Sequence, residues 1–245
     1  MRIQPNNCHI NVILNVDNPL TMNLFRKIAS ELIGTYMLVF VGTSAIVIND
    51  LYQGVITHLG IAIVFGLIVT VVIYSLGRIS GAHINPAVTI AFWLANRFPS
   101  QMVVPYIFAQ LMGALLASLT VSIMFAEHST LGSTLPVGSV KQSFVLEVIL
   151  TFILMLTIIS VATGSKEEGF VAGIVIGMVV ALSALFAGPV SGASMNPARS
   201  IGPAIVSGNI QHLWIYLVSP VIGASMAIAC FRCLHEDNCC KQATI

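Results

Sequence analysis

Six long apolar stretches divide the chain, and they constrain its fold more than any other feature. They cover residues 28–48, 55–76, 103–125, 144–162, 170–187 and 213–231. A bilayer core of about 30 Å is spanned by about 20 residues of apolar α-helix. Only 8% of the residues are charged, whereas soluble domains carry about 25%, so a water-facing shell cannot form. We therefore expect an all-α membrane protein with six transmembrane helices in contact with the lipid bilayer.

The composition and the absence of certain motifs exclude several other classes of protein. The net charge of +1 leaves no cluster of Lys and Arg for nucleic-acid phosphates. The first 27 residues lack the apolar segment of a signal peptide. A chain this apolar is also not expected to be disordered or to be a secreted enzyme. The sequence has no nucleotide-binding glycine loop, no nucleophile paired with a base and no His–carboxylate cluster with metal spacing in the apolar stretches. We expect neither enzymatic activity nor a cofactor nor a bound metal.

The cysteines lie only near the two ends of the chain, at Cys8, Cys230, Cys233, Cys239 and Cys240. An odd number with none in the middle of the chain is not a disulfide framework. The last four are candidates for palmitoylation beside the membrane, with metal binding as the alternative.

The basic residues predict the direction of the spans. If the amino terminus is cytoplasmic, eight of the 10 Lys and Arg residues also face the cytoplasm, and only Lys141 and Arg199 lie outside. Residues 1–27 and 232–245 are then cytoplasmic tails, and residues 126–143 are an extracytoplasmic connecting loop. We expect both termini in the cytoplasm and the plasma membrane as the location.

Two further apolar stretches, 86–95 and 197–206, are too short to span a bilayer. Ten helical residues reach only about 15 Å. Each follows a matching octapeptide, because residues 80–87 recur as residues 191–198, 111 positions later, and Glu31 recurs as Glu147. The chain therefore contains two repeats of three spans and one half-helix, at 28–125 and 144–231. Three is an odd number, so the second repeat must be inverted, and the two half-helices enter from opposite faces and meet at the midplane.

The residues at the half-helix tips predict a channel for small neutral solutes. Asn85 and Asn196 are suited to cap a helix, and Pro86 and Pro197 to begin one. The capping amides then direct NH₂ donors at a common centre, and two positive helix ends oppose the entry of cations and protons. The carbonyl oxygens of Gly81, Ala82, His83, Gly192 and Ser194 are expected to line the approach.

The paired boxes Asn85-Pro86-Ala87 and Asn196-Pro197-Ala198, with Arg199 after the second, resemble those of the aquaporin or major intrinsic protein family. The resemblance covers about residues 26–231, and residues 187–200 are similar to the plant nodulin-26-like subfamily in particular. It implies a homotetramer in which each subunit carries its own pore.

The resemblance also implies an outer selectivity filter at Phe65, Ala184, Ala193 and Arg199. Strict water channels typically have His at the position of Ala184, so two alanines here imply a wide aperture for glycerol, urea, boric acid or arsenous acid. Two residues depart from related patterns: Phe65 stands where the subfamily usually has Trp, and Ser200 stands where glycerol facilitators usually have Asp. Water conduction is therefore also expected, and a channel mainly for water is the alternative.

Glu31 and Glu147 lie within spans, where acids are candidates for function. A proton-coupled transporter would use such groups, and inverted repeats also occur in transporters. The resemblance implies instead that both acids bind the backbone of the re-entrant loops. A scaffold with little flux is a third possibility.

Overall fold

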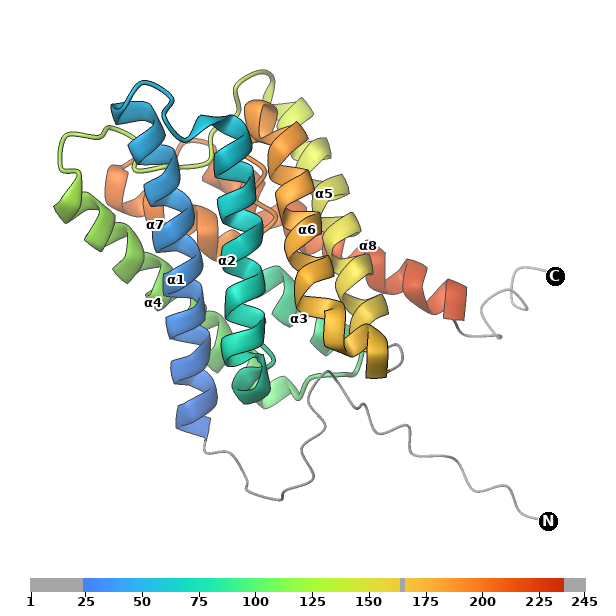
Figure 1. Ribbon diagram of the computed structural model, residues 1–245. Helices are drawn as coiled ribbons and strands as arrows, with labels where there is room; N and C mark the ends of the chain where they lie inside the picture. The colour runs from blue at the N-terminus through green and yellow to red at the C-terminus, as the bar shows by residue number, and fades with distance from the viewer. Residues whose placement is uncertain (1–23, 164–165, 236–245) are drawn as a thin grey trace, which may run out of the picture.

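The computed structural model describes residues 24–163 and 166–235, and this part of the chain forms eight α-helices (Figure 1). The helices are α1 (Leu24–Leu51), α2 (Thr57–Ser80), α3 (Pro86–Leu94), α4 (Ser100–Met124), α5 (Val140–Thr163), α6 (Lys166–Ser191), α7 (Pro197–Ser207) and α8 (Leu213–His235). Most of the amino-terminal tail, and with it Cys8, lies outside the described residues, as do Cys239 and Cys240.

Six of these helices are long and apolar enough to cross a bilayer, namely α1, α2, α4, α5, α6 and α8. The helices α3 and α7 are short, with 9 and 11 residues. The predicted fold of six spans and two half-helices is confirmed. Several spans extend beyond the apolar stretch; for example α1 begins at Leu24 and includes Arg26 and Lys27, because a helix continues into water past the hydrocarbon core.

The two repeats pack in the same way. Within the first repeat α1 lies against α2 and α4, and within the second α5 lies against α6 and α8. Gly113 and Gly223 mark the matching contacts: a Cβ at Gly113 would lie 3.0 Å from the backbone nitrogen of Tyr36, and one at Gly223 would lie 3.0 Å from that of Phe152. Small residues let these helix pairs approach closely.

Helices α2 and α6 join the two repeats along their length. Gly173 and Gly177 of α6 face α2, in line with the close packing expected from the spacing of Gly169, Gly173 and Gly177. A Cβ at Gly173 would lie 2.8 Å from the ring of Tyr74. Glycine at this position therefore serves helix packing rather than chemistry.

Each half-helix packs against the last span of the other repeat. Helix α3 lies against α8, and α7 lies against α4. In Figure 1, α7 lies in the upper part of the molecule and α3 in the lower part, so the two enter from opposite ends. The repeats are therefore interlocked rather than side by side.

Candidate functional site

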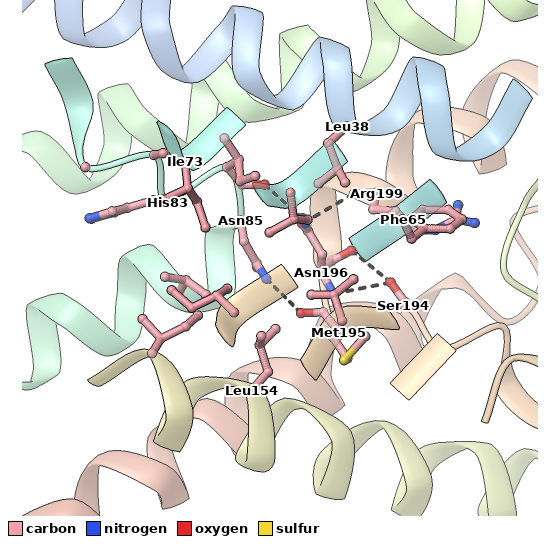
Figure 2. Close-up of a pocket in the computed structure, with 18 of the residues that line it drawn as sticks. Leu38, Phe65, Ile73, His83, Asn85, Leu154, Ser194, Met195, Asn196 and Arg199 are labelled. Carbon is pink, nitrogen blue, oxygen red and sulfur yellow. Dashed lines mark hydrogen bonds between the residues drawn. The ribbon is translucent and has the colours of Figure 1, made fainter. Parts of the chain in front are cut away.

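An internal cavity lies between the half-helix tips and the helices α1, α2, α5 and α6 (Figure 2). Ten of the predicted site residues line it: Phe65, Gly81, Ala82, His83, Asn85, Ala184, Ala193, Ser194, Asn196 and Arg199. The remaining lining residues are aliphatic or aromatic, among them Leu38, Val69, Ile73, Leu154 and Val180. A few polar groups therefore stand in an otherwise apolar wall.

The other predicted site residues are not among those that line this cavity. Pro86, Ala87, Pro197 and Ala198 form the buried first turns of α3 and α7, and Gly192 precedes the second tip. Glu31 and Glu147 have no exposed surface. The two acids can therefore act on the pathway only through the groups that they hold.

Both asparagines cap their own half-helix. The Asn85 side-chain oxygen accepts a hydrogen bond from the backbone nitrogen of Ala87 at 2.9 Å, and that of Asn196 accepts from Ala198 at 3.0 Å. Each asparagine has extended backbone geometry, and proline follows as the first helical residue. Asparagine is favoured at such a cap because its oxygen satisfies a backbone N–H that has no helical partner.

The two amides also bind the opposite loop. Asn85 Nδ2 donates to the carbonyl oxygen of Met195 at 2.8 Å, and Asn196 Nδ2 donates to that of Ile84 at 2.8 Å. This differs from the expectation that both NH₂ groups point at the centre, because buried carbonyl oxygens need donors. An amide carries two N–H groups, so one N–H of each asparagine remains for a solute. In Figure 2 the two side chains lie between His83 on one side and Phe65 with Arg199 on the other.

The loops before the tips hold a strained backbone. Four residues other than glycine have positive φ values: Ala82 (46°), Ile84 (43°), Ala193 (43°) and Met195 (54°). Such a conformation costs about 1–3 kcal/mol at a residue other than glycine, and it persists only where its surroundings enforce it. The loop conformation must therefore be stabilised by other parts of the chain.

The two buried acids provide that stabilisation. Glu31 accepts hydrogen bonds from the backbone nitrogens of His83 (2.9 Å) and Ile84 (2.7 Å). Glu147 accepts from those of Ser194 and Met195, both at 2.8 Å. Charged acceptors form strong hydrogen bonds, so each carboxylate fixes two consecutive peptide groups of one loop.

Side chains that the sequence analysis missed complete these networks. Tyr106 donates to the carbonyl oxygen of Ser80 at 2.9 Å, and Tyr216 donates to that of Ser191 at 2.7 Å. The two tyrosines stand 110 positions apart, so the repeat itself could have revealed them. Gln110 donates to Glu31 at 2.7 Å. The repeat could not have revealed this residue, because the equivalent position, 110 residues later, is Pro220.

Arg199 is fixed on two sides. Its Nη1 donates to the carbonyl oxygen of Gly132 at 2.9 Å, and its guanidinium carbon lies 5.1 Å from the centre of the Phe65 ring. Only 3% of its surface is exposed, and within the described residues its Nε has no hydrogen-bond partner. A buried donor without a partner is available to an acceptor that enters the cavity.

A chain of hydroxyl groups ties the loop between α4 and α5 to the second tip. Ser200 Oγ lies 2.6 Å from Ser194 Oγ and 2.7 Å from Thr134 Oγ1. The segment between α4 and α5, expected only to connect the repeats, therefore supplies both Thr134 and Gly132 to the surroundings of the pathway. Neither residue carries a motif by which the sequence could have singled it out.

At the other end of the cavity His83 is enclosed by aromatic rings. Its ring centre lies 4.9 Å from that of Phe92 and 4.7 Å from that of Phe98. Its Nδ1 lies 3.2 Å from Thr89 Oγ1. The side chain thus lines the cavity in a fixed orientation.

At the carboxyl end of α8, Cys230 is half-buried and Cys233 is exposed. Within residues 24–163 and 166–235, no group of three His, Cys, Asp or Glu residues is arranged to hold a metal ion.

The chain resembles known proteins over most of its length. Residues 20–231 match the family model described as "Major intrinsic protein". Aquaporin NIP1-1 of Zea mays is 50% identical over 220 residues, which cover 89% of this chain and 78% of the relative. Nodulin-26 of Glycine max is 48% identical over 209 residues, covering 85% and 77%. The X-ray structure of the aquaglyceroporin from Plasmodium falciparum has a TM-score of 0.77 at 23% identity, covering 91% of this chain and 100% of that one, and supports the fold.

Proposed function

We propose that this chain, which belongs to the major intrinsic protein family, among the nodulin-26-like aquaporins, passes solutes larger than water. As a member of this family it is a membrane channel for small neutral solutes and water. Glycerol, urea and undissociated boric or arsenous acid are the solutes that we assign to it, with water as a further permeant. The supporting observation is the presence of alanine at two of the four proposed filter positions, Ala184 and Ala193, both lining the cavity. The relatives are channels, so the chain is not an enzyme.

We assign the outer filter to Phe65, Ala184, Ala193 and Arg199. The Arg199 guanidinium offers donors to a hydroxyl or water oxygen and repels cations. The Phe65 ring offers an apolar surface to C–H groups, and the two alanine methyl groups leave room beside them. A polyol or a hydroxyl acid can then bind Arg199 through oxygen while its carbon or central atom faces the ring.

We assign the central constriction to Asn85 and Asn196. Their bonds to Met195 and Ile84 fix both amides, which supports a rigid pair of donors at the point where two positive helix ends meet. The carbonyl oxygens of Gly81, Ala82, His83, Gly192 and Ser194 would then provide acceptors on either side. This arrangement favours a neutral solute that donates and accepts hydrogen bonds, and it opposes cations and protons.

The buried acids serve as supports for the loops in this mechanism. Each carboxylate is occupied by backbone N–H donors and by a serine, Ser80 for Glu31 and Ser191 for Glu147. A proton carrier would need a carboxylate exchanging with the pathway, and neither acid lines the cavity. Passive diffusion through a fixed pathway therefore fits better than proton-coupled transport.

The assembly and location are also part of this proposal. We assign a homotetramer to this chain, and the position of the cavity within one chain supports a separate pore in every subunit. Both termini are assigned to the cytoplasm, because eight of the 10 basic residues then lie on that side. The plasma membrane is the proposed location.

Flux measurements in proteoliposomes test the function. Vesicles with the purified chain would be exposed to gradients of water, glycerol, urea and boric acid, with and without an imposed pH gradient. We expect solute uptake that does not saturate and does not depend on the pH gradient. Water flux alone would identify a water channel. Saturating uptake driven by the pH gradient would identify a transporter, and flux no higher than in empty vesicles would identify a scaffold. Each of these results would contradict the proposal.

A further inference from the structure

Gly42 of α1 forms the surface against which the Phe65 ring rests. A Cβ at Gly42 would come within 2.8 Å of three atoms of that ring, Cδ1, Cε1 and Cζ. The Arg199 guanidinium lies 5.1 Å from the centre of the same ring, and Figure 2 shows the two side chains together. The ring thus has Gly42 as one neighbour and Arg199 as another. Any side chain larger than the hydrogen atom of glycine at position 42 would overlap the ring in its present position.

The repeat relates position 42 to the wall of the pathway. Helices α1 and α5 correspond with a shift of 116 residues, as Glu31 and Glu147 do. Leu38 and its counterpart Leu154 both line the cavity, and so does Ile158, the counterpart of Gly42. A side chain at position 42 would therefore face the pathway, as the side chain of Ile158 does in the second repeat.

The backbone of α1 near Gly42 is held by the segment that holds Arg199. A Cβ at Gly132 would lie 3.0 Å from the Cβ of Thr43, and the Gly132 carbonyl oxygen accepts the Arg199 hydrogen bond. Moving α1 outward would disturb this contact. A methyl group at position 42 is therefore relieved by rotation of the Phe65 ring rather than by movement of the helix.

We propose that Gly42 is a determinant of solute selectivity, because it sets how far the Phe65 ring is withdrawn from the aperture. This inference rests on the proposed assignment of Phe65 to the outer filter. A larger residue at position 42 displaces the ring toward the centre of the pathway and narrows the passage. Solutes with a carbon skeleton lose more permeability than water, which is smaller.

The test is a set of four proteins: the wild type, Gly42→Ala, Phe65→Ala and the double variant, each reconstituted in vesicles. Glycerol and water permeability are measured per inserted channel. We expect Gly42→Ala to lower glycerol permeability by about tenfold, which corresponds to a barrier higher by roughly 1.4 kcal/mol, and to lower water permeability much less. Phe65→Ala alone should raise the ratio of glycerol to water flux.

The double variant decides between a local and a general effect. Without the Phe65 ring, the Gly42→Ala change should leave glycerol permeability nearly unaltered. An equal loss in both backgrounds would show that Gly42 does not act through Phe65 and would overturn the inference while leaving the filter intact. No change in the flux ratio with Phe65→Ala would instead remove the filter assignment and the inference with it.

Gly77→Ala is the matched control, because the nearest atoms to a Cβ at this helical glycine, those of Ala82 and Ile73, lie 3.9 Å away. It should leave both permeabilities unaltered. If the Gly42→Ala variant does not reach the membrane, the abundance of each variant in the membrane is measured instead of its permeability. Recovery of abundance in the double variant with Phe65→Ala supports the inference, and failure to recover overturns it.

Discussion

Gly66 of α2 and Gly177 of α6 meet face to face, and they are equivalent residues of the two repeats, 111 positions apart. A Cβ at either one would come within 2.5 Å of the carbonyl oxygen of the other. The two backbones thus leave no room for a side chain between them, where the repeats meet.

Alanine at either of these glycines should destabilise the protein. Overpacking of a well-packed contact costs about 1–3 kcal/mol, and here the added methyl group meets backbone, which cannot rotate away. Heat-induced unfolding in detergent should therefore occur at a lower temperature for Gly66→Ala and Gly177→Ala than for the wild type. Gly77→Ala on the same helix as Gly66 should unfold like the wild type; an equal decrease there would show a general cost of alanine.

Replacement of Ala184 by histidine should make the channel more selective for water over glycerol. The Ala184→His side chain would occupy the space that the methyl group leaves open, so glycerol permeability should fall by about tenfold or more while water permeability falls far less. Vesicle shrinkage and re-swelling in glycerol measures both. Equal loss of the two fluxes at normal membrane abundance would refute the placement of Ala184 in the filter.

Aspartate at either tip asparagine should weaken cation exclusion. Asn85→Asp keeps an oxygen to cap α3, but it loses the donor to the Met195 carbonyl and places a negative charge where two helix ends are positive. Asn196→Asp does the same toward Ile84. We expect cation conductance in planar bilayers and a lower glycerol flux from both variants. Conductance at the wild-type level would contradict the proposed electrostatic barrier.

Glutamine in place of either buried acid should loosen one re-entrant loop. In Glu31→Gln, one carboxylate oxygen becomes an NH₂ group that cannot accept the backbone N–H of Ile84 or His83. A buried donor left without a partner costs about 1–3 kcal/mol, so the unfolding temperature should fall for Glu31→Gln and for Glu147→Gln. Glycerol flux should stay independent of a pH gradient in both; coupling that exists in the wild type and disappears in a variant would favour a transporter.

The sequence predicted the architecture because the signals that specify it are long and redundant. Span length, the duplicated octapeptide and the odd number of spans in each repeat all lead to the same inverted arrangement. The tip asparagines were predictable for a local reason, since capping depends on a few neighbouring residues. The structure agrees on each of these points.

The sequence did not reveal contacts that depend on the three-dimensional approach of distant segments. The bonds from Asn85 to Met195 and from Asn196 to Ile84 cross between the repeats, so no local pattern encodes them. Thr134 lies in a segment without periodicity or repeat partner. Gly42 contributes by lacking a side chain, and a glycine inside an apolar helix does not by itself indicate what occupies the space beside it.

The exchange of half-helices between the repeats has a consequence for how the protein is made. Helix α3 is synthesised early, whereas α8, against which it packs, is synthesised after the other seven described helices. Until then α3 has α4 beside it but lacks α8, so a chain truncated before Leu213 would leave one face of this half-helix uncovered. The packing around the first half-helix is therefore complete only once α8 lies against it, so the protein needs both of its halves before this part of the passage is enclosed.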